Sequence, residues 1–213
     1  MMKVVTLENV EVQFRKNVLL TNVNLTVNAG DLILLNGDNG TGKSTLLKVI
    51  CGLLRPNNGK VSVFNQELSK GKFASDTAVM INAPQFIGNY SGLENLCALA
   101  RIKHKIDAST VKHYMKLVGL DPENKTKVKK YSLGMNQKLG LAQALMEDEK
   151  LILLDEPLNG LDKTSKIKLI DLIAKIHQEK PDKTWIIVSH DDSFNEICNR
   201  KWQIQDKELS VSE

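Results

Sequence analysis

Residues 37–45 read Gly37-Asp38-Asn39-Gly40-Thr41-Gly42-Lys43-Ser44-Thr45, so that a Gly-Lys-Ser triplet follows Gly37 after four residues. An apolar run at 32–35 precedes this stretch and a second one at 46–50 follows it, which predicts a strand before it and a helix after it. Glycines allow positive φ and a close approach of the backbone, so consecutive N–H groups can point at an anion beside the helix N-terminus. The stretch therefore predicts a phosphate-binding loop.

Length and composition exclude several classes of protein. The 213 residues suit one α/β domain with room for an inserted subdomain. A net charge of +4 and 5% aromatic residues do not indicate a nucleic-acid surface, so no nucleic-acid partner is expected. Cys51, Cys97 and Cys198 lie far apart, which predicts neither disulfides nor a zinc site and favours a reducing cytoplasm. No apolar run approaches the ~20 residues that span a bilayer, so a role at a membrane would require another chain.

Apolar patterning predicts two kinds of sheet. Alternation over 4–27 and again over 60–64 is typical of antiparallel strands with one solvated face. The unbroken apolar runs at 151–154 and 185–188 are typical of parallel strands buried on both faces, and 167–176 reads as the helix that connects them.

Between 92 and 145 apolar residues recur at helical spacing, which predicts a helical insert. The predicted fold is an α/β P-loop nucleoside triphosphatase core with a mainly parallel sheet, an N-terminal antiparallel β subdomain and an inserted helical subdomain. We expect one domain over 1–213, in which 1–85 and 146–213 form the core and 86–145 form the insert.

A pair of acidic residues, Asp155-Glu156, ends the apolar run at 151–154. In a nucleoside triphosphatase Asp155 would hold Mg²⁺, directly or through water, and Glu156 would polarise a water for in-line attack on the γ-phosphate. Such a pair is a weak signal alone and a strong one together with the loop at 37–45. Lys43 is then expected to reach the β- and γ-phosphates of ATP, and Ser44 to complete the coordination of Mg²⁺.

A third motif, at 131–138, reads Tyr-Ser-Leu-Gly-Met-Asn-Gln-Lys. Ser132 can cap the helix that follows, and Gly134 leaves backbone N–H groups of the first turn open to approach. Ser-x-Gly-x-x-Gln shortly before a strand that ends in Asp-Glu resembles the signature helix of the ATP-binding-cassette (ABC) family. The resemblance extends over almost the whole chain.

This resemblance implies further site residues. Phe14 resembles the aromatic residue that stacks on adenine, although an aromatic residue in a strand can equally belong to the core. Gln85 falls where the family has a glutamine at Mg²⁺, and 157–162 resembles the loop across the dimer interface. His190 resembles the switch histidine near the γ-phosphate, the alternative being a structural histidine. The residues expected at ATP are Phe14, Gly37, Asp38, Asn39, Gly40, Thr41, Gly42, Lys43, Ser44 and Thr45, with Ser44, Gln85 and Asp155 at Mg²⁺ and Glu156, His190 and Lys43 in catalysis.

The resemblance also implies partners. Two cassettes would close head to tail on two ATP molecules, with Ser132, Gly134 and Gln137 of one chain facing the ATP held by the other. A homodimer is expected because both sets of residues look intact, and a heterodimer stays open. The dimer would power an integral membrane permease and would lie in the cytoplasm on the inner face of the cell membrane.

The signature departs from the usual Leu-Ser-Gly-Gly-Gln at Leu133 and Met135. The variant resembles the subfamily that exports bacitracin, lantibiotics and similar antimicrobial peptides, which implies an ATPase subunit of such an exporter. One alternative is a soluble cassette that clamps nucleic acid, ribosomes or a protein assembly; the single cassette and the modest charge speak against it. A small-molecule kinase would leave Ser132 to Gln137 without a purpose. The transported substrate is not indicated, because specificity lies with the membrane subunit.

Overall fold

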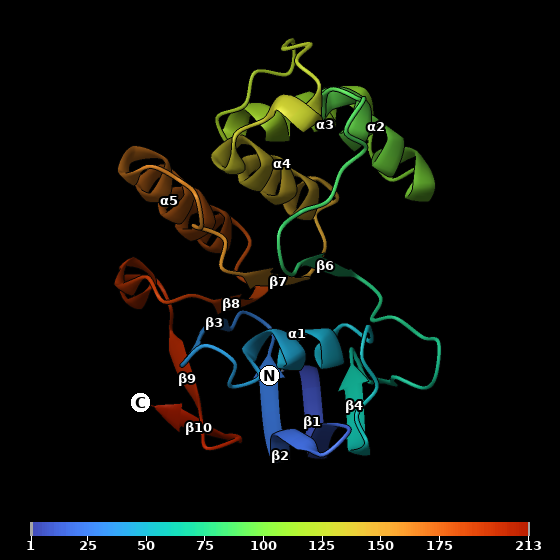
Figure 1. Cartoon of the computed structure of the whole chain (residues 1–213), viewed down its shortest axis with the longest axis vertical. Helices are drawn as coiled ribbons and strands as arrows, with labels where there is room; N and C mark the ends of the chain where they lie inside the picture. The colour runs from blue at the N-terminus through green and yellow to red at the C-terminus, as the bar shows by residue number, and fades with distance from the viewer. Residues whose placement is uncertain (1, 213) are drawn as a thin grey trace.

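The computed structural model describes residues 2–212 and contains two β-sheets with helices around them (Figure 1). The smaller sheet is antiparallel and has the strand order β2-β1-β4-β5. Its strands are β1 (Lys3–Phe14), β2 (Asn17–Asn28), β4 (Asn58–Val63) and β5 (Gln66–Glu67).

The larger sheet has six strands in the order β10-β9-β3-β8-β7-β6. All neighbouring strands in it are parallel except β10, which pairs antiparallel with β9. The strand β3, which leads into the predicted phosphate loop, lies between β8 and β9, in the interior of the sheet. The six strands are β3 (Leu32–Gly37), β6 (Thr77–Met80), β7 (Leu151–Asp155), β8 (Thr184–Val188), β9 (Arg200–Gln205) and β10 (Glu208–Ser212).

The helices form two groups. Helix α1 (Lys43–Ile50) lies between the two sheets, and α5 (Lys163–Glu179) lies beside the other face of the larger sheet (Figure 1). Helices α2 (Gly92–Lys103), α3 (Ala108–Leu117) and α4 (Leu133–Met146) gather at the far end of the molecule (Figure 1). Two short 3-10 helices are Val128–Lys130 and Asp192–Glu196. Within 2–212, no helix combines the length and apolar composition of a membrane span.

The larger sheet separates two hydrophobic cores. Successive side chains of a strand point to opposite faces, so alternate residues of β7 and β8 enter different cores. Ile152 and Ile187 pack toward the helices α2 to α5, whereas Leu153 and Ile186 pack toward α1 and the antiparallel sheet. Burial on both faces explains why these strands are apolar without interruption. The predicted fold class is confirmed.

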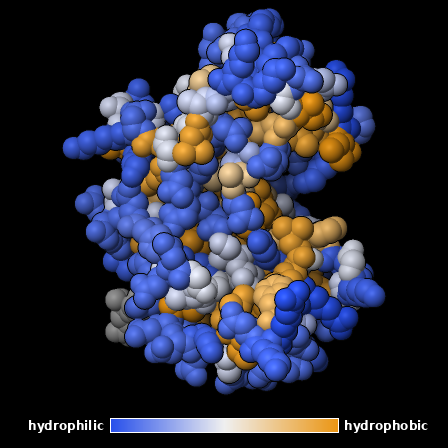
Figure 2. Space-filling view, viewed as in Figure 1, coloured by the Kyte–Doolittle hydropathy of each residue, from blue (hydrophilic) through white to orange (hydrophobic). Residues whose placement is uncertain are grey.

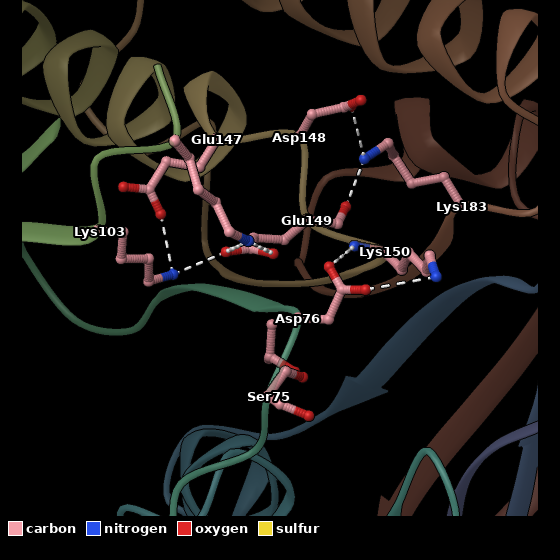
Figure 3. Close-up of polar contacts among 10 residues, drawn as sticks. Ser75, Asp76, Lys103, Glu147, Asp148, Glu149, Lys150 and Lys183 are labelled. Atoms are coloured by element: carbon pink, nitrogen blue, oxygen red, sulfur yellow. Dashed lines mark hydrogen bonds and ion pairs between the residues drawn. The ribbon is translucent and has the colours of Figure 1, made fainter.

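A network of ion pairs joins the end of α2 to the segment between α4 and β7 (Figure 3). Glu149 is only 2% exposed and accepts from Lys103 Nζ at 2.6 Å and Lys105 Nζ at 2.9 Å. On its other side, Lys183 Nζ donates to the Glu149 backbone oxygen and pairs with Asp148 at 3.0 Å. The network therefore holds the helical group against the larger sheet at the edge where β7 and β8 begin.

The charge of Glu149 is stabilised in this network. Burial alone would raise the pKa of the Glu149 carboxyl, but hydrogen bonding with Asp76 and with the two lysines outweighs burial and lowers it to about 2. A lowered pKa means that the folded state favours the ionised form. The resulting stabilisation is complete above the usual carboxyl value of 4.5 and is lost as the pH falls toward 2.

We expect Glu149→Gln to lower the free energy of unfolding at pH 7 by about 2 kcal/mol, because it leaves Lys103 and Lys105 without their buried partner. Denaturant titrations from pH 7 to pH 2 would measure the loss. The difference from wild type should shrink as the pH falls from 4.5 to 2, because Glu149 binds a proton in the unfolded state before it does so in the folded state. The control is Glu123→Gln at the exposed pair with Lys112, which should cost little. An equal loss in both variants at all pH values would contradict this role of Glu149.

Candidate active site

The loop at 37–42 joins the end of β3 to the start of α1, as its sequence predicts. Gly37 has φ 146° and Gly42 has φ 106°, which are values that glycine adopts without strain. Both positions are also crowded: a Cβ on Gly37 would lie 2.6 Å from the Ile204 carbonyl oxygen, and one on Gly42 would lie 3.1 Å from Leu20. The loop thus wraps closely around a space at the N-terminus of α1.

Lys43 reaches back into this loop. Its ammonium group donates to the carbonyl oxygens of Gly37 at 2.6 Å and Asp38 at 2.7 Å. Burial lowers the pKa of Lys43, while the nearby carboxylates of Glu156 and Asp155 work in the opposite direction. The ammonium group is thus held by two backbone carbonyls of the loop, and a lysine in such a loop suits the binding of a phosphate.

The acidic pair lies across from this loop. A cavity of about 280 Å³ is lined by Lys43, Ser44, Asp155 and Glu156 together with Leu19, Asn39, Gly40, Gly42 and Thr45. A second cavity, of about 450 Å³, shares Ser44, Asp155 and Glu156 with the first. The structure therefore brings the phosphate loop and the acidic pair together, although they lie more than 100 residues apart in the sequence.

Glu156 has an unusual backbone conformation. It follows β7 directly, and its φ of 49° lies in the left-handed region, which costs a residue with a Cβ about 1 kcal/mol or more. Its N–H donates to the Val188 carbonyl oxygen at 2.8 Å. Burial raises the pKa of Glu156, partly opposed by the charge of His190. A raised pKa brings this carboxylate closer to the range in which a general base works well at neutral pH.

His190 lies two residues after β8, beside both the phosphate loop and the acidic pair. Its Nε2 is 3.1 Å from Asn39 Oδ1 and 3.4 Å from Glu156 Oε1. Almost half of its side chain is exposed. The imidazole thus bridges the phosphate loop and Glu156, an arrangement that a structural histidine packed in the core would not adopt.

Asn82, rather than Gln85, lines the cavity beside Ser44 and Asp155. Gln85 is exposed and lies three residues farther along the chain. Asn82 follows the end of β6 by two residues and has φ 62°, so the backbone turns there as it does at Glu156. Ligands of open α/β sheets bind at the carboxyl ends of the strands, and this rule applied to β6 would have pointed to Asn82.

Three oxygen donors line this cavity together: the hydroxyl of Ser44, the carboxylate of Asp155 and the amide of Asn82. Hard cations such as Mg²⁺ prefer this donor set. The residues present therefore fit a magnesium ion, and Asn82 rather than Gln85 is the amide beside them.

Ser132 caps α4, as predicted, and accepts from the Met135 N–H at 3.1 Å. Gly134 has a packing role as well: a Cβ there would lie 2.7 Å from the Gly160 carbonyl oxygen. Gly160, at φ 74°, in turn leaves room for Leu133, whose Cγ would lie 2.5 Å from a Cβ on Gly160. The first turn of α4 and the loop 157–162 are therefore packed together through two glycines.

Gln137 does not project from the surface with Ser132. Its side chain is 4% exposed, and its Nε2 donates to the backbone oxygen of Glu156 at 2.9 Å. Gln137 lies five positions after Ser132, and the pitch of α4 turns it toward Glu156 of its own chain. Its expected contact with the ATP of a partner chain stays a prediction.

Phe14 lies at the end of β1 and is 49% exposed. It pairs with Asn17 across a tight hairpin, and the same hairpin carries Leu19 into the cavity lining. An exposed aromatic ring at this place is not a core residue. Its stacking on adenine stays a prediction, which the exposed ring allows.

Several known proteins are similar to this chain in sequence and in fold. The model of the family described as ABC transporter matches residues 20–159. The ABC transporter ATP-binding protein YybJ of Bacillus subtilis is 31% identical over 207 residues, which cover 96% of this chain and 94% of YybJ. The bacitracin transport ATP-binding protein BcrA of Enterococcus faecalis is 34% identical over 189 residues, which cover 88% of this chain and 61% of BcrA.

The architecture also matches a solved structure, a dimer of the ATP-binding cassette MJ0796 in a post-hydrolysis state bound to ADP and Pi. The match has a TM-score of 0.89 at 24% identity and covers 98% of each chain. The chain thus belongs to the ABC transporter family, as an ATP-binding subunit that hydrolyses ATP to power transport.

Proposed function

We propose that the cavity between the phosphate loop and β7 binds ATP with Mg²⁺. The convergence of Lys43, Ser44, Asp155 and Glu156 on one cavity carries this proposal. Lys43 and the backbone amides of the loop would hold the phosphates, and Ser44, Asp155 and Asn82 would hold the ion that neutralises their charge. Glu156 would accept a proton from the attacking water, and His190 would hold the γ-phosphate end of the site in place.

We infer that the working unit is a dimer in which each chain completes the site of the other. Ser132 and Leu133, at the start of α4, are exposed and lie outside the 280 Å³ cavity that Lys43 lines. Free amides at a helix N-terminus attract anions, so this turn is suited to a γ-phosphate held by a second copy of the chain. A homodimer is sufficient, because this chain carries both halves of such a site.

A cleft at the other end of α4 is the proposed docking site for a membrane subunit. It has a volume of about 270 Å³ and is lined by Ala78 and Val79 of β6, by Leu99 and Ile102 of α2 and by the end of α4. Ile102 is 73% exposed. Figure 2 shows the molecule hollowed at its right-hand edge below α2, with hydrophobic residues on both sides of the hollow. An apolar segment of the membrane subunit would cover these side chains.

This arrangement gives α4 two ends with different tasks. Its first turn lies at the proposed ATP interface, and its last turn lines the proposed docking cleft. The helices of 86–145 would then move as one rigid body when the dimer closes on ATP. The dimer would work on the cytoplasmic face of the cell membrane. Export of an antimicrobial peptide is the proposed task, because the signature variant at Leu133 and Met135 resembles that subfamily and because BcrA is a relative.

We expect Glu156→Gln to slow ATP hydrolysis by about a hundredfold or more, because the amide cannot accept the proton from water. ATP binding should be preserved, since Lys43 and the loop are unchanged. Steady-state phosphate release and the Kd of a fluorescent ATP analogue would measure the two effects. Turnover close to that of wild type would remove Glu156 from its proposed role.

A second pair of variants tests the ion site. Asn82→Ala should raise the Mg²⁺ concentration needed for half-maximal hydrolysis by about tenfold, because one oxygen ligand is lost. Gln85→Ala is the matched control and should leave the Mg²⁺ requirement unchanged. The reverse result would return the role to Gln85.

The docking cleft is tested by Ile102→Glu, with Ile167→Glu on α5 as a control at another exposed isoleucine. The full chain, carrying Glu156→Gln and ATP to stabilise the closed dimer, would be used to capture partners from detergent-solubilised membranes. We expect a multi-spanning membrane protein with the parent chain and with Ile167→Glu, and a loss of at least about tenfold with Ile102→Glu. Capture of ribosomal or nucleic-acid-binding proteins alone would instead support a soluble clamp.

A further inference from the structure

Gln137 is a buried amide with one recorded partner, the backbone oxygen of Glu156 at 2.9 Å. The contact joins residues that are 19 positions apart and belong to different elements, α4 and the turn after β7. The same oxygen also accepts from the Asn159 N–H at 3.2 Å, which lies in the same turn, so Gln137 supplies the donor that comes from another element. Gln137 therefore helps to hold the backbone at the residue whose carboxylate the reaction uses.

The backbone of Glu156 depends on support from both sides. Its left-handed φ of 49° is unfavourable for a residue with a Cβ. The Glu156 N–H is held by Val188 at 2.8 Å, and its carbonyl is held by Gln137 and by the Asn159 N–H at 3.2 Å. Asn159 belongs to the same turn, so Gln137 is the contact that ties this carbonyl to α4. Without it the turn could shift against α4, and the carboxylate would leave its position 3.4 Å from His190 Nε2.

The same helix makes a second contact with the same turn. Gly134, one turn before Gln137, packs against the Gly160 carbonyl, so that a Cβ would approach it to 2.7 Å. The segment 156–160 is thus fastened to α4 at both of its ends. A shift of the first turn of α4 would be passed to Glu156, because the helix is rigid over this distance.

We propose that Gln137 is a positioning residue for hydrolysis: it aims the Glu156 carboxylate and makes that aim depend on where the first turn of α4 lies. The proposal rests on the function proposed above, in which this first turn contacts the ATP held by a second copy of the chain. The contact would link the two ATP sites of the dimer, because each chain's general base is aimed by the helix that senses the other chain's nucleotide.

The test is Gln137→Met, which keeps the approximate size of the side chain and removes the donor. We expect kcat for ATP hydrolysis to fall about tenfold, while KM and the Kd of a fluorescent ATP analogue stay within twofold. The control is Gln178→Met, the same change at an exposed position of α5, which should leave kcat unchanged. Gln137→Asn keeps the amide but draws it back by one methylene, and an intermediate kcat is expected.

A single-turnover measurement with Glu156→Gln separates positioning from general destabilisation. If Gln137 acts through Glu156, adding Gln137→Met to Glu156→Gln should cause little further loss, because the group being aimed is already missing. A further tenfold loss in the double variant would overturn the proposal, as would a Gln137→Met variant that loses ATP affinity rather than kcat.

Different results would overturn the proposed function and the proposed role of Gln137. A wild-type chain that hydrolyses no ATP in any assembly would overturn the proposed function. A wild-type chain that hydrolyses ATP beside a Gln137→Met variant of equal kcat would overturn only the role of Gln137. If Gln137→Met does not fold, the Gln137→Asn variant decides, and a normal kcat in that variant contradicts the proposal.

Discussion

The parallel arrangement of β3, β6, β7 and β8 is the constraint on which the rest of the site depends. Parallel strands end at the same edge of a sheet, and these four deliver the phosphate loop, Asn82, the acidic pair and His190 to that edge. The strands are buried on both faces, so their positions are fixed by two cores rather than one. The groups of the site therefore follow strands that are buried on both faces.

Tight turns after these strands aim the side chains. Gly37, Asn82 and Glu156 all have positive φ, and each lies at or just beyond the end of its strand. A turn of this kind bends the chain across the edge of the sheet, toward a ligand there. For Asn82 and Glu156 the conformation is unfavourable, and the surrounding contacts outweigh its cost.

Helix α4 connects this rigid edge to the rest of the molecule. Its first turn packs on the loop 157–162, Gln137 holds Glu156, and its last turn lines the cleft below α2. The ion network around Glu149 fastens the helical group to the opposite edge of the sheet. Under the proposed function, coupling between ATP and a membrane partner would run along α4.

Much of this protein could be predicted from local sequence. The spacing of Gly37 to Ser44 between two apolar runs identified a phosphate loop, because a tight turn between a strand and a helix needs those residue types in that order. The doubly buried strands were evident from their unbroken apolar runs, and the acidic pair from its place after one of them. The fold class followed from these patterns together.

The tertiary structure decided which residues actually meet. Asn82 rather than Gln85 lines the cavity with Asp155, because β6 pairs beside β7 and ends two residues before Asn82. Gln137 turns inward because of the rotation of α4 against the turn after β7. Glu149 gathers lysines from α2 and the loop beyond it only once the chain has folded. The sequence by itself determined local geometry and chemistry, whereas the contacts between distant segments depend on packing, which is a property of the whole chain.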